Sequence, residues 1–175
     1  MFSKILIANR GEIACRIINT ARKMGIHAIS VFSEADRFSK HVSLSDESIY
    51  IGNSESKESY LNIDSIIKAA KMTKAEAIHP GYGFLSENPD FVDAVNKAGI
   101  CFIGPSKEAI SIMGDKIESK ILADKANVST VPGFIGEVVD LNHAQQIANS
   151  IGYPVMIKAS AGGGGKGMRI AKNPE

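Results

Sequence analysis

The chain has 175 residues, of which 44% are hydrophobic and 22% are charged, so it is long enough to bury a core without disulfides or a structural metal. Twenty Lys and Arg against 19 Asp and Glu give a net charge of +1, which argues against a nucleic acid partner held through its phosphates. No run of 18 apolar residues occurs and the N-terminus is rich in charge, so we expect neither a membrane span nor a secretory signal.

The first 104 residues alternate between short apolar runs and segments of helical periodicity. The apolar runs predict five buried strands over Lys4–Ala8, His27–Phe32, Ser48–Ile51, Glu76–His79 and Ile100–Ile103. The periodic segments predict helices over Gly11–Met24, from an Asn62 cap to Met72, and over Phe91–Ala98. Strands that alternate with helices form parallel sheets with right-handed crossovers. The sequence therefore predicts an α/β fold with a Rossmann-like open parallel sheet.

The pattern changes after Gly104. The segments expected to be regular are two helices in Pro105–Ala126, broken near Gly114, a helix Leu141–Ile151 between an Asp140 cap and Gly152, and strands Pro154–Ala159 and Met168–Ala171. We place a domain boundary between Gly104 and Asp115. Residues 1–110 are then the Rossmann-like domain, and residues 111–175 are the truncated start of a second domain.

A dense glycine loop separates the last two predicted strands. Five of the 16 glycines fall within Gly162–Gly167. The spacing fits the dinucleotide pattern, but that pattern must open a helix, and a phosphate loop needs Ser or Thr after Lys166. The remaining interpretation is a flexible hairpin that can close over a triphosphate, because side chains do not shield its glycine N–H groups. Lys158 and Lys166 are then available to bind the phosphates. The alternative is a surface hairpin without a ligand. It is disfavoured because ordering five glycines costs chain entropy that no ligand would offset.

Both cysteines have apolar neighbours in the sequence. Cys15 and Cys101 are therefore predicted to be buried core thiols rather than redox or metal-binding groups. So few cysteines suit a reducing compartment, and we expect a cytoplasmic location.

Four segments together resemble the biotin carboxylases, a family of ATP-grasp enzymes. They are Ala8–Ile13 (ANRGEI), His79–Asn88 (HPGYGFLSEN), Met113–Lys116 (MGDK) and Tyr153–Gly167 (YPVMIKASAGGGGKG). The last segment also resembles carbamoyl-phosphate synthetases, whereas His79–Asn88 looks specific to biotin carboxylases. Within the family, Asp115–Lys120 and Ala159–Ala171 are most similar to the α subunits of propionyl-CoA carboxylases.

The resemblance implies a ligase that carboxylates biotin with ATP and bicarbonate, as part of an acyl-CoA carboxylase. It implies magnesium and biotin as cofactors, with a biotin carboxyl carrier domain, a carboxyltransferase subunit and a second copy of the chain as partners. Family members continue for several hundred residues. We therefore expect this chain to be an inactive N-terminal fragment, with the catalytic groups, the magnesium ligands and the biotin attachment site beyond residue 175.

The resemblance also implies roles for single residues. The expected ATP-binding residues are Lys116, Lys158, Gly163, Gly164, Gly165 and Lys166. Tyr82 is a candidate contact to biotin, with a purely structural turn as the alternative, and Arg16 is a candidate contact between subunits, with a plain surface arginine as the alternative. His79 and the segment Asn9–Glu12 are interpreted as structural.

Other functions stay open at this point. The chain could belong to the biotin carboxylase of an acetyl-CoA or pyruvate carboxylase, or to another ATP-grasp ligase such as a carbamoyl-phosphate synthetase. A different class is a non-catalytic nucleotide-binding or assembly module that uses Asn9–Glu12 at the start of the first helix.

Overall fold

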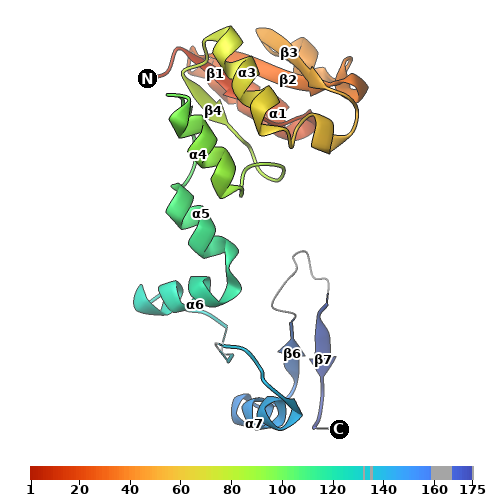
Figure 1. The fold of residues 1–175 in the computed structure, drawn as a ribbon, viewed down its shortest axis with the longest axis vertical. Coiled ribbons are helices and arrows are strands. Elements are labelled where there is room, and N and C mark those ends of the chain that lie inside the picture. The colour runs from red at the N-terminus through yellow and green to blue at the C-terminus, as the bar shows by residue number, and fades with distance from the viewer. Residues whose placement is uncertain (132, 135, 159–166, 175) are drawn as a thin grey trace. The chain divides into compact units, whose positions relative to one another are not determined.

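The computed structural model describes residues 1–131, 133–134, 136–158 and 167–174, and the side chain of Lys116 lies outside this description. The chain divides into two compact units, Met1–Ser111 and Ile112–Glu175 (Figure 1). Within the part of the chain that is described, no helix has the length and hydropathy needed to cross a bilayer.

The first unit is built on a five-stranded sheet. Its strands are β1 (Lys4–Ile7), β2 (His27–Ser33), β3 (Glu47–Gly52), β4 (Ala77–His79) and β5 (Cys101–Phe102). The order is β3-β2-β1-β4-β5, and every neighbouring pair is parallel. This confirms the predicted Rossmann-like open parallel sheet. The chain winds outward from β1 in one direction and then returns to place β4 on its other side, so the two halves of the sheet meet between β1 and β4.

Helices connect these strands, and the periodicity predicted three of them. The connecting helices are α1 (Gly11–Lys23), α2 (Lys40–Leu44), α3 (Ile63–Thr73) and α4 (Pro89–Lys97), with 3-10 turns η1 (Glu34–Asp36) and η2 (Ser56–Glu58), and α5 (Lys107–Gly114) follows β5. Asn62 caps α3 by accepting a hydrogen bond from the Ser65 N–H, and Asn88 caps α4. Helix α2 and the two 3-10 turns were not predicted, because a segment of three to five residues carries too little periodicity to detect.

The core lies on both faces of the sheet. Helix α1 packs Ala14, Ile18 and Ala21 against one face, which β1 supplies with Ile5 and Ile7. Helices α3 and α4 cover the opposite face, to which β1 contributes Leu6. Burial of both faces explains why the strands appear as unbroken apolar runs in the sequence.

The prediction that both cysteines are buried core thiols is wrong. Cys101 is exposed and Cys15 is partly exposed. Strand β5 is an edge strand in which Phe102 points into the core, so its neighbour Cys101 points away from it. Cys15 follows buried Ala14 on α1 and lies one position round the helix from the inward stripe. Apolar neighbours in sequence do not determine which face a residue occupies.

The second unit contains two helices and a hairpin. They are α6 (Lys116–Lys125), α7 (Leu141–Ile151), β6 (Val155–Ile157) and β7 (Arg169–Ala171). The strands pair antiparallel, with Val155 opposite Ala171 and Ile157 opposite Arg169, which confirms the predicted returning strand. Helix α7 has the predicted bounds, the Asp140 cap and the stop at Gly152.

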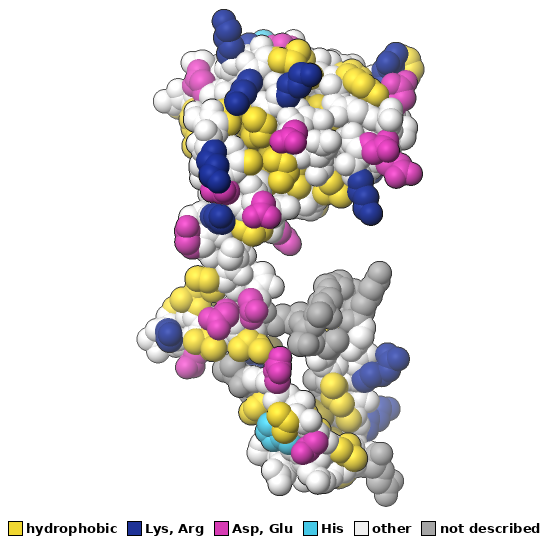
Figure 2. Space-filling view, in the orientation of Figure 1, with side chains coloured by type: hydrophobic (Ala, Val, Ile, Leu, Met, Phe, Trp, Pro, Cys, Tyr) yellow, Lys and Arg dark blue, Asp and Glu magenta, His cyan; other side chains and the backbone are white. Residues whose placement is uncertain are grey.

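Much apolar surface remains open in the second unit. Among its described residues, Ala148 is the only buried hydrophobic residue. Large hydrophobic side chains are exposed on α7 and on both hairpin strands, including Leu141, Met156, Ile157 and Ile170, and Figure 2 shows hydrophobic side chains at the surface of this unit. Among the described residues of the second unit, α7 and the hairpin thus both leave apolar surface in contact with solvent.

Candidate ligand site at the carboxyl edge of the sheet

A buried asparagine joins the ends of the two central strands. Asn9 follows β1 closely and is fully buried, and its amide nitrogen donates to the carbonyl oxygens of Pro80 at 2.8 Å and Tyr82 at 2.9 Å. Its Oδ1 accepts from the Arg10 N–H at 2.9 Å. Pro80 and Tyr82 lie in the loop after β4, so the Asn9 side chain lies at the carboxyl ends of β1 and β4, the region in which open α/β sheets usually bind ligands.

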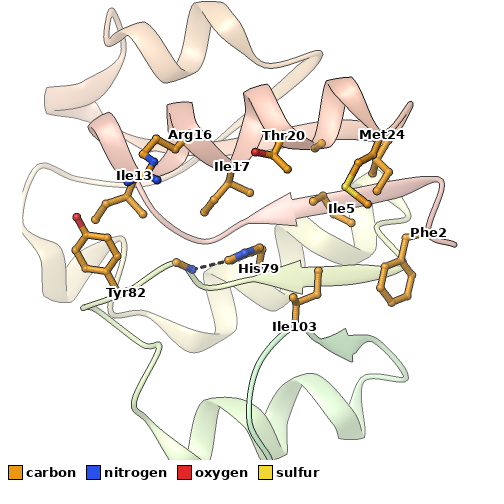
Figure 3. A pocket seen from close by; sticks show the side chains of 13 residues that line it. Phe2, Ile5, Ile13, Arg16, Ile17, Thr20, Met24, His79, Tyr82 and Ile103 are labelled. Atoms are coloured by element: carbon orange, nitrogen blue, oxygen red, sulfur yellow. Dashed lines mark hydrogen bonds between the residues drawn. The ribbon is translucent and has the colours of Figure 1, made fainter.

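The loop after β4 is held in a shape that requires glycine. Gly81 has a φ of +67°, and a Cβ at this position would lie 2.7 Å from Ile13 Cγ2 and 2.8 Å from Asn9 Nδ2. The Gly81 N–H donates to His79 Nδ1 at 3.0 Å (Figure 3). Burial lowers the pKa of His79, so its neutral ring acts as an acceptor at neutral pH. This contact agrees with the interpretation of His79 as a structural histidine.

Beyond the loop, an aromatic and ionic cluster gathers four residues that lie far apart in sequence. The Arg10 guanidinium pairs with Asp36 at 3.1 Å and lies 5.4 Å from the ring centroid of Tyr60 and 5.5 Å from that of Phe84. The two rings stack at 5.0 Å. The Tyr60 hydroxyl donates to Asp36 at 2.8 Å. We call Arg10, Asp36, Tyr60 and Phe84 the Arg10 cluster.

The Asp36 carboxylate carries most of the hydrogen bonds of this cluster. Burial alone would raise its pKa, but hydrogen bonds from Tyr60, Arg10 and Ser33 outweigh that effect and leave the pKa below its ordinary value. Burial raises the pKa of Tyr60, so its hydroxyl stays protonated and remains a donor. At neutral pH the Asp36 carboxylate is thus ionised and the Tyr60 hydroxyl is neutral, which preserves the hydrogen bond between them. No short sequence motif predicted the Arg10 cluster.

At the start of α1, backbone N–H groups donate hydrogen bonds to side chains of the protein itself. The Gly11 N–H donates to Nδ1 of His41 at 3.3 Å, and the Arg10 N–H donates to Asn9. His41 is fully buried and its Nε2 lies 3.2 Å from the Val31 carbonyl oxygen. A pyrophosphate would need these N–H groups. Their engagement argues against the dinucleotide module and supports a structural role for the segment.

The buried His41 is expected to make the fold sensitive to mild acid. Burial lowers its pKa below the ordinary 6.5, so the unfolded chain takes up this proton first, and stability falls as the pH drops from about 6.5 towards the folded pKa. Asp36, whose pKa is lowered in the fold, reduces the stability further only when the pH falls to about its ordinary pKa of 3.8 and below. His41→Gln stays neutral and should flatten the fall in unfolding free energy between about pH 7 and pH 5, measured by urea titration. His79 shifts in the same direction, so some slope should remain. An identical slope in the variant would contradict this assignment.

Tyr82 and Arg16, two of the predicted site residues, line the same pocket. The pocket has a volume of about 630 Å³ and lies beside α1, between the start of β1 and the loop after β4. Its walls are mostly apolar, with Ile5, Ile17 and Ile103 among them. Tyr82 and Arg16 lie at one end (Figure 3), and the Tyr82 side chain is 65% exposed. Arg16 pairs with Glu12 on α1 at 3.7 Å, and both side chains are exposed.

The predicted ATP-binding residues belong to the second unit. Lys158 directly follows β6, rather than lying within the strand as predicted, and is exposed. Lys116 is the first residue of α6, after the Asp115 cap, which accepts from the N–H groups of Ile117 and Glu118. Gly163, Gly164, Gly165 and Lys166 lie outside the described residues. Among those that are described, no three His, Cys, Asp or Glu side chains gather as metal ligands.

Two family profiles match consecutive parts of the chain. The profile described as biotin carboxylase, N-terminal domain, matches residues 1–110. The profile described as carbamoyl-phosphate synthase L chain, ATP binding domain, matches residues 115–175.

Known proteins resemble the chain along its whole length. It is 58% identical over 175 residues to the propionyl-CoA carboxylase alpha chain of Ruegeria pomeroyi, which covers 100% of this chain and 26% of that protein. The crystal structure of a biotin carboxylase β,γ-ATP complex from Campylobacter jejuni has a TM-score of 0.91 and 50% identity, over 99% of this chain and 39% of that one. The biotin carboxylase domain dimer of Hydrogenobacter thermophilus 2-oxoglutarate carboxylase, with MgADP, ADP and bicarbonate, has a TM-score of 0.88 and 48% identity, over 99% and 38%.

The chain thus spans about a quarter of the length of the curated relative. The profile of the biotin carboxylase N-terminal domain covers more than half of its residues, and its fold matches that of solved biotin carboxylases. The chain belongs to the biotin carboxylase family.

Proposed function

We propose that this chain is the N-terminal part of a biotin carboxylase, a ligase that uses ATP and bicarbonate to carboxylate biotin within an acyl-CoA carboxylase, most closely of the propionyl-CoA type. The observation that supports the proposal most is the match of 99% of the chain to a biotin carboxylase solved as a β,γ-ATP complex, at 50% identity and a TM-score of 0.91. In this proposal residues 1–110 form the N-terminal domain and residues 111–175 begin the ATP-grasp domain.

ATP binding is assigned to the second of these domains. Lys116, Lys158 and Lys166 would contact the nucleotide, and Gly163, Gly164 and Gly165 would supply N–H groups to its phosphates. Phosphoryl transfer depends mainly on positioning and on neutralising charge, which are the two things that lysines and glycine N–H groups provide. The carboxylates that would hold magnesium are assigned to parts of the protein beyond residue 175.

Biotin recognition and assembly are assigned to the pocket beside α1. Tyr82 would contact biotin from the loop after β4, and Arg16 would contact a second subunit from the exposed side of α1. The shared pocket and the exposure of both side chains support this assignment. The partners in the full protein would be a biotin carboxyl carrier domain and a carboxyltransferase subunit.

The two unpaired cysteines favour a reducing, cytoplasmic location.

A biotin-dependent ATPase assay of the full-length protein tests the proposed function. ATP hydrolysis that requires bicarbonate and rises with free biotin is expected. The 175-residue chain alone should show none, because the proposed magnesium and bicarbonate groups lie outside it. Hydrolysis by the full-length protein that ignores biotin would favour another ATP-grasp ligase. Turnover by the purified 175-residue chain would contradict the proposed division of the active site.

A further inference from the structure

We propose that Asn9 is a positioning residue for biotin: by holding the backbone on both sides of Gly81, it fixes the place from which Tyr82 meets the ligand. The proposal rests on the role of Tyr82 in the proposed function. Asn9 itself is fully buried, so it acts through the loop rather than by touching a ligand.

Both donors of the Asn9 amide are used on this loop. One side-chain nitrogen serves the carbonyl oxygens of Pro80 and Tyr82, at 2.8 and 2.9 Å. The orientation of the amide is set by chemistry, because its oxygen facing two carbonyl oxygens would offer no donor to either. Two carbonyl groups two residues apart are thereby tied to the end of β1, the most central strand of the sheet.

A second set of contacts holds the loop two residues after Tyr82. Phe84, with a φ of +44°, stacks on Tyr60 at 5.0 Å, and the Arg10 guanidinium lies over both rings. Asn9 and Arg10 are adjacent in sequence. Two adjacent residues that follow β1 therefore hold the loop before Tyr82, at Pro80, and after it, at Phe84.

The contrast between the backbone and the side chain of Tyr82 indicates what the anchoring is for. The Tyr82 carbonyl oxygen is held by a buried amide, whereas its side chain is 65% exposed at the end of the pocket. A core residue would need its ring buried, and a plain surface turn would not need two hydrogen bonds from a buried side chain. A rigid backbone that presents an exposed ring suits ligand binding, because little conformational freedom is lost when the ligand arrives.

The decisive variant is Asn9→Asp in the full-length protein. Aspartate keeps the size of the side chain and the acceptor for the Arg10 N–H, but it removes both donors and sets a carboxylate against two carbonyl oxygens. The matched control is Asn53→Asp, the same change at an exposed loop residue whose Oδ1 lies 3.4 Å from the Tyr50 hydroxyl.

Two measurements are made on each variant. Amide hydrogen exchange of peptides that cover His79–Asn88 reports the order of the loop. The KM for free biotin and the KM for ATP are compared with those of the wild type and of Tyr82→Ala, which removes the exposed ring. For Asn9→Asp we expect faster exchange in that peptide and a rise of about 10- to 100-fold in the KM for biotin, with the KM for ATP within about twofold, since a displacement near 1 Å is enough for such a loss. Asn53→Asp should match the wild type.

The outcomes separate the positioning role from the role of Tyr82. Unchanged exchange in Asn9→Asp overturns the proposal, as does faster exchange with an unchanged KM for biotin while Tyr82→Ala raises that KM. An unchanged KM in Tyr82→Ala, together with biotin-dependent ATPase activity in the wild type, removes Tyr82 from the site and leaves the family function standing. If Asn9→Asp does not fold, Asn9→Ala serves instead, because it removes the same donors from Pro80 and Tyr82 without placing a charge against their carbonyl oxygens. The same two readouts then decide.

Discussion

Lys158→Ala in the full-length protein is expected to weaken ATP binding by about 10- to 150-fold, which corresponds to ~1.5–3 kcal/mol for a charge-assisted phosphate contact. Lys158 stands where β6 enters the glycine loop, so its ammonium group is available to the ligand that the loop would cover. Lys158→Arg keeps the charge and should lose less. Isothermal titration with a non-hydrolysable ATP analogue measures the dissociation constant directly.

The hairpin supplies a matched control for this prediction. Ile157 pairs with Arg169 next to the loop, whereas Val155 pairs with Ala171 at the far end. Lys172, which is exposed, follows that far end. Lys172→Ala removes the same charge from the same hairpin and should leave the affinity unchanged. Equal losses in both variants would indicate a general electrostatic effect, and no loss in a folded Lys158→Ala would remove Lys158 from the nucleotide site.

The parallel sheet was predictable because its signals are local. Each buried strand appears as an apolar run, and α1 and α3 show one apolar face each, so the alternation alone fixes the fold class. Capping was equally local: Asn62 and Asp140 each accept from an N–H group three residues on. Edge strands were harder. In β5 only Phe102 faces the core, and the sequence pattern could not assign Cys101 to the outer face.

The contacts around the candidate site were not predictable in the same way. The resemblance to the family pointed to Tyr82 and Arg16, and the fold brings both to one pocket. The partners of Arg10, in contrast, are determined by tertiary structure. Asp36 follows β2 and Tyr60 precedes α3, and no spacing rule links either of them to Arg10. The same holds for His41, which no pattern marked and which closes the start of α1.

Gly81→Ala is expected to destabilise the first unit by about 2–5 kcal/mol, a large share of the stability of a typical domain. Two costs add up. An L side chain in the left-handed region costs ~1–2 kcal/mol, and the φ of Gly81 is +67°. The new Cβ would also lie 2.7 Å from Ile13 Cγ2 and 2.8 Å from Asn9 Nδ2, and overpacking of this kind costs ~1–3 kcal/mol. Urea unfolding followed by far-UV circular dichroism measures the loss.

Gly83→Ala separates the two costs within the same loop. Gly83 has a φ of +71°, but a Cβ there would meet no atom within 4 Å, so this variant carries the backbone cost without the clash. The difference between the two variants therefore measures how tightly the loop after β4 packs on Asn9 and α1. In the full-length protein, Gly81→Ala should also raise the KM for biotin more than Gly83→Ala does, because only the former pushes on the Asn9 amide. Equal destabilisation by both variants would mean that the loop can move away from α1 at little cost, and a loop that yields so easily could not hold Tyr82 in place.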